Sequence, residues 1–161
     1  ICGRIAPLLL CSKSEEAFLK NVADFVSITH NSELALNASD FFAKILWMSQ
    51  TNDDTVTLIN ELKPKYPLLS KWIDDAIVKK GSNSFDTIRD FGPACGIDGG
   101  FACVIYLLLQ NKDFKTLMIE NAKAGGDSSA RGMIVAMILG IKEGIDLPEE
   151  WIKGMKMGLH I

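Results

Sequence analysis

Apolar residues recur at helical spacing along almost the whole chain, and stretches that alternate apolar with polar residues are scarce. An apolar residue every three or four positions gives a helix one face that packs against a core. The first two such stripes are Phe18, Val22, Phe25 and Val26, and then Leu34, Ala35, Ala38, Phe41, Phe42, Ile45 and Leu46. The sequence therefore predicts an all-α domain of roughly nine helices joined by short connections.

Residues typical of helix ends predict where several of these helices begin. Ser12 with Glu15 fits a capping box in front of the first stripe. Thr51 or Asn52 is placed to cap a short third helix. Pro67 suits the first position of the helix that follows.

The second half of the chain has the same helical character. The apolar run 101–109 fits a buried strand or a buried helix, and we predict a helix because its neighbours are helical. The glycine-rich segment 92–100 is expected to be irregular. Asp146 with Glu149 resembles a capping box before a last short helix.

Size and charge exclude several classes of protein. The chain has 161 residues, of which 48% are hydrophobic, and this is enough for one domain with a core. Its formal charge of −3 leaves no broad basic field, so we expect neither nucleic acid nor an anionic membrane surface as a partner. The longest apolar runs are far shorter than the ~20 residues of a membrane span.

The cysteines and the first residue carry two further expectations. Cys2, Cys11, Cys95 and Cys103 form no CxxC pair and lie in apolar sequence, which predicts buried, reduced thiols in a cytoplasmic protein. The chain opens on Ile1 inside an apolar stretch. We therefore expect the first part of the domain to be missing from this sequence.

The most informative stretch is 121–133, where Gly125 and Gly126 precede Asp127 at the expected start of a long helix. Two glycines allow a sharp turn and a close approach of backbone to ligand. Exposed N–H groups at a helix N-terminus favour an ionised carboxylate, and a rigidly held carboxylate suits Mg²⁺. The simpler interpretation is that Asp127 only caps its helix.

Small residues recur every fourth position in this helix, at Gly132, Ala136, Gly140 and Gly144. A face with so few side chain atoms lets another helix approach closely. The sequence therefore predicts that this helix is central and ends near Gly144, and that it holds any group at its start rigidly.

Several motifs, in order, resemble the ADP-ribosylglycohydrolase family. Residues 125–130, the helix of small residues and residues 147–151 are similar to the C-terminal signature of that family. Residues 4–7 (Arg-Ile-Ala-Pro) and 29–32 (Thr-His-Asn-Ser) are similar to two of its other stretches. The resemblance implies an orthogonal multi-helix bundle with a central cleft, and residues 1–161 would be the C-terminal portion of a single such domain.

The resemblance also implies an activity and a site. Family members use two Mg²⁺ or Mn²⁺ ions to cleave an N- or O-glycosidic bond of ADP-ribose, so ADP-ribose or an ADP-ribosylated substrate is the implied ligand. It implies that Asp127 binds metal and takes part in catalysis. The residues implied to bind substrate are His30, Gly125, Gly126, Ser128, Ser129 and Arg131.

The sequence departs from the family at two metal ligands, because Ser129 and Ala130 stand where the family has Asp and Thr. Losing an anionic ligand weakens a site for divalent ions, so we expect one ion or none. Arg131 either holds an anionic ligand group or is an ordinary helix residue, and His30 is either a ligand group or structural. The alternatives are thus an active hydrolase and a catalytically degenerate member with a binding or structural, crystallin-like role.

Overall fold

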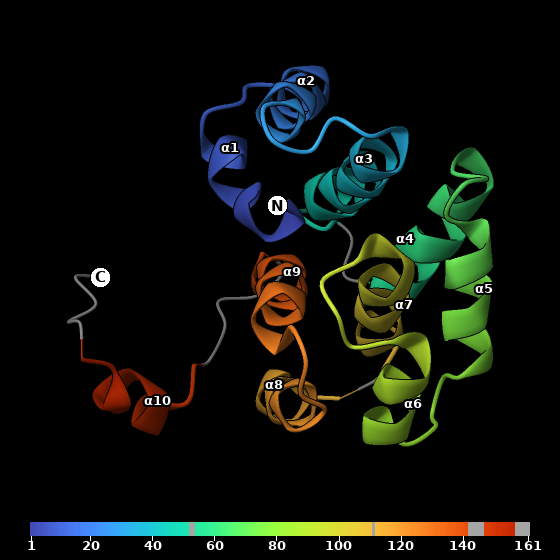
Figure 1. Ribbon diagram of the computed structural model, residues 1–161. Helices are drawn as coiled ribbons and strands as arrows, with labels where there is room; N and C mark the ends of the chain where they lie inside the picture. Colours follow the sequence, from blue (N-terminus) through green and yellow to red (C-terminus); the bar gives the residue numbers. More distant parts are fainter. Residues whose placement is uncertain (52–53, 111, 142–146, 157–161) are drawn as a thin grey trace.

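The computed structural model describes residues 1–51, 54–110, 112–141 and 147–156, which form helices joined by turns and loops (Figure 1). The predicted all-α fold is confirmed within these ranges. The elements are η1 (Cys2–Arg4), α1 (Ala6–Leu10), α2 (Glu15–Ser27), α3 (Glu33–Met48), α4 (Thr55–Leu62), η2 (Lys63–Lys65), α5 (Ser70–Val78), α6 (Ser84–Phe91), α7 (Ile97–Leu108), α8 (Phe114–Lys123), α9 (Ser128–Gly140) and α10 (Glu149–Gly154).

Helix α7 is the centre of the bundle and lies among α3, α5, α6 and α9 (Figure 1). Every residue from Phe101 to Leu108 is buried, on all sides of the helix. A helix that is apolar all round belongs in the interior, which explains why the run 101–109 forms a helix where no partner strand is at hand. Phe101 also joins an aromatic cluster with Phe41 and Phe42 of α3.

Helix α9 packs against α8, η1, α7 and α3, as its small residues predicted. A Cβ atom added at Gly132 would lie 3.1 Å from Asn121 Nδ2 of α8, so glycine permits this close approach. On another side, Gly3 of η1 lies so near Met133 that an added Cβ would be 2.6 Å from its Cβ. Helix α9 ends at Gly140, with Ile141 in a turn, and so stops short of the predicted end near Gly144, which lies outside the described residues.

Three predicted helix starts need correction. Ser14, and not Ser12, caps α2 by accepting from Ala17 N at 3.2 Å. The Ser12 hydroxyl instead donates to the carbonyl of Leu8, within α1. The capping-box pattern gave the wrong residue because the serine directly before the helix is the one that caps it.

The next two predicted helices, which correspond to α4 and α5, also begin later than expected. Asp54 caps α4, while the Thr51 hydroxyl donates to the carbonyl of Met48; Asn52 lies outside the described residues. Pro67 lies in a turn, and α5 begins at Ser70. The expected pair of Asp146 and Glu149 cannot be compared, because 142–146 lie outside the described residues.

The cysteine prediction was wrong for three of the four residues. All four are free thiols, as expected, but only Cys103 is buried. Cys2 is partly buried, and Cys11 and Cys95 are exposed. Cys11 follows the end of α1, and Cys95 lies in the loop before α7, so neighbouring apolar residues in sequence do not cover them.

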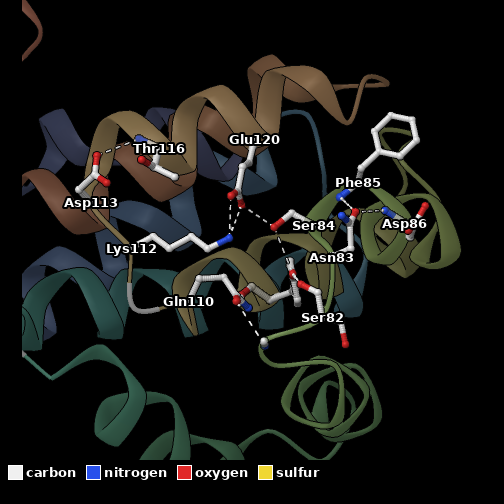
Figure 2. A network of polar contacts seen from close by, with 12 residues as sticks. Ser82, Asn83, Ser84, Phe85, Asp86, Gln110, Lys112, Asp113, Thr116 and Glu120 are labelled. Atoms are coloured by element: carbon white, nitrogen blue, oxygen red, sulfur yellow. Dashed lines mark hydrogen bonds and ion pairs between the residues drawn. The ribbon is translucent and has the colours of Figure 1, made fainter.

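A polar network joins α6, α7 and α8 (Figure 2). The buried hydroxyl of Ser84 lies 3.1 Å from Tyr106 Oη and donates to Glu120 Oε2 at 2.5 Å. Tyr106 Oη donates to the carbonyl of Ser82 at 2.6 Å. Lys112 Nζ completes the network with an ion pair to Glu120 at 2.6 Å. The buried hydroxyls of Ser84 and Tyr106 in this network therefore have hydrogen-bond partners.

Acid should weaken this network. Burial raises the pKa of Glu120, but hydrogen bonds from Lys112 and Ser84 outweigh burial and hold it below its ordinary value. A carboxylate with a lowered folded pKa stabilises the protein above the unfolded pKa of about 4.3, and this contribution is lost as the pH falls. We predict that urea unfolding shows a steeper loss of unfolding free energy in acid for the wild type than for Glu120→Gln.

Glu150 provides the matched control. Its hydrogen bond from Lys115 also lowers its pKa, but its side chain is 60% exposed against 27% for Glu120. Solvent screens exposed pairs, so Glu150→Gln should change the acid dependence less than Glu120→Gln does. Equal acid dependence in the wild type and Glu120→Gln would contradict the assignment.

Candidate functional site

A cavity of about 140 Å³ lies where the starts of α7 and α9 meet η1 and α3. Its inner walls are apolar and come from Ala35, Ala38, Phe42, Phe101, Val104 and Ile134. Its polar residues are His30, Asp127 and Arg131, together with the backbone of the 94–97 segment. A concave, mostly apolar site with a few converging polar groups is the usual form of a small-molecule site.

A wider and more polar hollow of about 530 Å³ adjoins this cavity. The two share Ile1, His30, Asp127, Ala130 and Met133. The wider hollow adds the side chains Arg4, Phe25, Ile28, Thr29 and Ser129. Asp127 thus lies where the smaller, mainly apolar cavity and the wider, more polar hollow meet.

Asp127 is held from both its backbone and its side chain. Its N–H donates to the carbonyl of Pro93 at 2.8 Å. Its Oδ1 accepts from Ala130 N at 3.1 Å and so caps α9. Within the described residues, Oδ2 accepts no hydrogen bond, so one carboxylate oxygen is free to meet a ligand. The capping interpretation and the ligand interpretation are therefore compatible.

The two glycines before Asp127 have different reasons to be glycine. Both have positive φ angles, 73° at Gly125 and 62° at Gly126, which disfavour side chains. A Cβ atom at Gly125 would meet nothing within 4 Å, whereas one at Gly126 would lie 2.1 Å from the carbonyl oxygen of Pro93. Only Gly126 is required by the close approach of the 92–96 loop.

Arg131 is 2% exposed and donates four hydrogen bonds within the protein. Nε donates to Asn121 Oδ1 at 3.0 Å and Nη1 to the Pro93 carbonyl at 3.2 Å. Nη2 donates to the carbonyls of Asn121 and Gly125. Burial lowers the pKa of Arg131, and the nearby thiol of Cys103 and carboxylate of Asp127 oppose that effect. Arginine remains charged in such surroundings.

The other predicted site residues differ in whether they line the two hollows. His30 is exposed, lines both hollows, and has Nδ1 2.8 Å from Thr29 Oγ1. Ser129 lines the wider hollow. Ser128, Gly125 and Gly126 line neither of the two; the Ser128 carbonyl accepts from Asn121 Nδ2 at 2.7 Å. Their predicted contacts with substrate remain predictions.

Sequence reasoning missed two residues that shape the site. Pro93 contributes only its carbonyl oxygen, which accepts from Asp127 N and from Arg131. Asn121 uses its side chain amide to join Arg131 to the start of α9. The glycine-rich segment 92–100 was expected to be irregular, but residues 97–100 already belong to α7. Nothing in the composition of the segment marks one carbonyl as an acceptor.

The described residues supply few metal ligands. No grouping of three or more His, Cys, Asp or Glu side chains suited to a metal ion occurs within the described part of the chain. Near the cleft, Asp127 provides a carboxylate and Ser129 a neutral hydroxyl, and Ala130 provides no side chain ligand. No helix in ranges 1–51, 54–110, 112–141 and 147–156 is long and apolar enough to cross a membrane.

Comparisons with known proteins agree with the sequence motifs. The sequence model of the ADP-ribosylglycohydrolase family matches residues 2–161. Crystallin J1A of Tripedalia cystophora is 21% identical over 161 residues, an alignment that covers 98% of this chain and 50% of that protein. The chain thus spans about half the length of this curated relative. No solved structure matches this chain significantly.

The two glycines of the turn allow a controlled test of this geometry. Gly125→Ala introduces only the strain of a positive φ, of roughly 1–2 kcal/mol. Gly126→Ala adds a clash with the Pro93 carbonyl and should destabilise the protein more than Gly125→Ala, as measured by urea unfolding. Equal losses in the two variants would show that the 92–96 loop is not packed against this turn.

Proposed function

Because the chain belongs to the ADP-ribosylglycohydrolase family, we propose that its cleft binds ADP-ribose or an ADP-ribosylated group and serves hydrolysis of an N- or O-glycosidic bond. The observation that carries the proposal is the position of Asp127. Its carboxylate lies where the smaller, mainly apolar cavity meets the wider, more polar hollow, and His30 lines both. This is the residue that the motifs marked as the metal-binding and catalytic carboxylate.

The donor set decides how many metal ions these residues fit. Two adjacent divalent ions need several anionic ligands, and the described residues of the cleft offer one carboxylate, from Asp127. They do not fit a two-ion site on their own. They do fit one Mg²⁺, since this ion often takes one or two carboxylates, several waters and the phosphates of the substrate. Asp127 Oδ2 and the Ser129 hydroxyl are the side chain groups that would hold it.

A bound Mg²⁺ would neutralise the diphosphate of ADP-ribose and lower the pKa of a bound water. The chain's own residues orient the ligand. Asp127 is fixed by its cap and by Pro93, so its free oxygen has a defined direction. His30 is exposed on the rim and can donate to or accept from a ligand oxygen, while the apolar side chains of the inner cavity offer water no hydrogen bonds.

The second candidate is a catalytically degenerate member with a binding or structural role. The donor set favours it, because Ser129 and Ala130 remove two of the metal ligands that the family motif provides. The name of Crystallin J1A indicates that this relative serves as a crystallin. The two candidates differ in one measurable property, which is metal-dependent hydrolysis of an ADP-ribosylated substrate.

We predict that calorimetric titration of the protein with ADP-ribose shows binding that requires Mg²⁺ or Mn²⁺. Asp127→Asn keeps an oxygen that caps α9 but removes the negative charge. The Asn variant should therefore weaken metal-dependent binding at least roughly 10- to 100-fold, which is the effect of losing an outer-shell partner at a metal site. Metal-dependent hydrolysis of an ADP-ribosylated substrate would then separate the active from the degenerate candidate.

Asp113→Ala is the control for effects of helix capping. Asp113 caps α8 by accepting from Thr116 N at 2.9 Å and lies on the surface. Its loss should lower the stability, as the loss of a helix cap does, and leave ligand binding unchanged. If the wild type binds no ADP-ribose with either metal, the hydrolase proposal is wrong and the structural role is supported.

The double change Ser129→Asp with Ala130→Thr restores the ligand types of the family motif. Added to Asp127, the new carboxylate should raise the affinity for Mg²⁺, measured by calorimetry without nucleotide. Ser128→Asp provides a control, because this position adds the same charge at the start of α9 but lines neither hollow. No gain in affinity from the double change, or an equal gain from the control, would contradict the match of these residues to the motif.

A further inference from the structure

Arg131 lies one helical turn after Asp127 and reaches three separate segments of the chain. Its guanidinium donates to the Pro93 carbonyl in the loop before α7, to Asn121 in α8, and to the Gly125 carbonyl in the turn before α9. The loop before α7 and the turn before α9 lead directly into residues that line the cavity, and α8 packs against α9. One buried side chain therefore joins all three.

The Pro93 carbonyl is the point where this arrangement meets Asp127. It accepts from Arg131 Nη1 at 3.2 Å and from Asp127 N at 2.8 Å. A shift of the 92–96 loop would therefore move the backbone of Asp127 and, with it, the free carboxylate oxygen. Gly126 packs directly against the same carbonyl and allows no side chain between them.

Because Arg131 is charged, burying its side chain costs free energy, and a gain in stability alone does not explain these contacts. Within the described residues, no carboxylate lies within ion-pair distance of its guanidinium, and its acceptors are an amide oxygen and three carbonyls. Burying a cation without a paired anion is costly. An apolar side chain of similar volume often gives equal or greater stability at a buried charged site. The arrangement instead specifies where three backbone segments lie.

We propose that Arg131 is a positioning residue, which fixes the Pro93 loop and the Gly125–Asp127 turn so that the Asp127 carboxylate faces the cleft. This role differs from the interpretation that Arg131 itself holds an anionic ligand group, since four of its five N–H donors are directed to protein atoms. The proposal rests on the proposed function only in taking Asp127 as the ligand-binding group.

Lysine cannot replace arginine in this role. The planar guanidinium presents its N–H groups in a fixed fork, whereas the lysine ammonium is a single point with three donors. Arg131→Lys keeps the charge and a long stem, so the variant should fold, but it cannot reach Pro93, Asn121 and Gly125 together. Arg131→Ala removes all the contacts and leaves a space that free guanidinium ion can enter.

The exposed cysteines allow the loop to be observed directly. Cys95 lies in the loop before α7, and Cys11 lies beyond α1, away from the site. With Cys2 replaced by alanine, a nitroxide is attached to Cys95 in a Cys11→Ser background, or to Cys11 in a Cys95→Ser background. Electron paramagnetic resonance then measures the mobility of each label, at a temperature where unfolding measurements show each variant to be folded.

We expect Arg131→Lys and Arg131→Ala to increase the mobility of the label at Cys95 and to leave the label at Cys11 unchanged. Guanidinium ion below denaturing concentration should restore the order of the Cys95 label in Arg131→Ala and have no effect on Arg131→Lys. An unchanged Cys95 label, or equal changes at both labels, would overturn the proposal, because Arg131 would then affect stability only. If Arg131→Ala does not fold, the result for Arg131→Lys decides.

Titration of unlabelled protein with ADP-ribose and Mg²⁺ keeps this proposal separate from the proposed function. Arg131→Lys should weaken binding at least several-fold while Asp113→Ala leaves it unchanged. If the wild type does not bind ADP-ribose, the proposed function fails, and the mobility of the Cys95 label still decides the role of Arg131. If the wild type binds and Arg131→Lys binds equally well, the positioning role is overturned and the proposed function stands.

Discussion

The carbonyl of Pro93 is the acceptor on which the candidate site depends. It receives hydrogen bonds from the backbone of Asp127 and from Arg131, and it lies against the bare Cα of Gly126. Because both donors meet at this half-buried carbonyl, they keep the start of α9 and the loop before α7 in one relative position. The rest of the bundle supports this contact, because α3 packs against both α7 and α9, and α8 packs against α9.

Much of the fold could be predicted from sequence, because helical periodicity and apolar content decide which faces are buried. The buried run 101–109 and the central helix after Asp127 illustrate this. Helix starts were less predictable, since Ser12 and Ser14, or Thr51 and Asp54, are both chemically able to cap. The exposure of Cys11 and Cys95 depends on which elements cover them, and that is a property of tertiary packing.

The candidate site was predictable in its position but not in its internal contacts. The glycines, Asp127 and His30 carry chemical patterns that a sequence displays, and the structure brings His30 and Asp127 to the same two hollows. The partners of Arg131 could not be foreseen. Three of its four acceptors are backbone carbonyls, which are the same in every residue, so only the fold decides which of them an arginine meets.

The apolar lining of the inner cavity has a consequence for hydration. Its volume of about 140 Å³ has room for water, yet Ala35, Ala38, Phe42 and Val104 offer such water no hydrogen bonds from their side chains. Poorly bound water is readily displaced by an apolar group. A ligand that places its least polar portion there should therefore bind with a negative change in heat capacity, set apart from the ionic contacts at the rim.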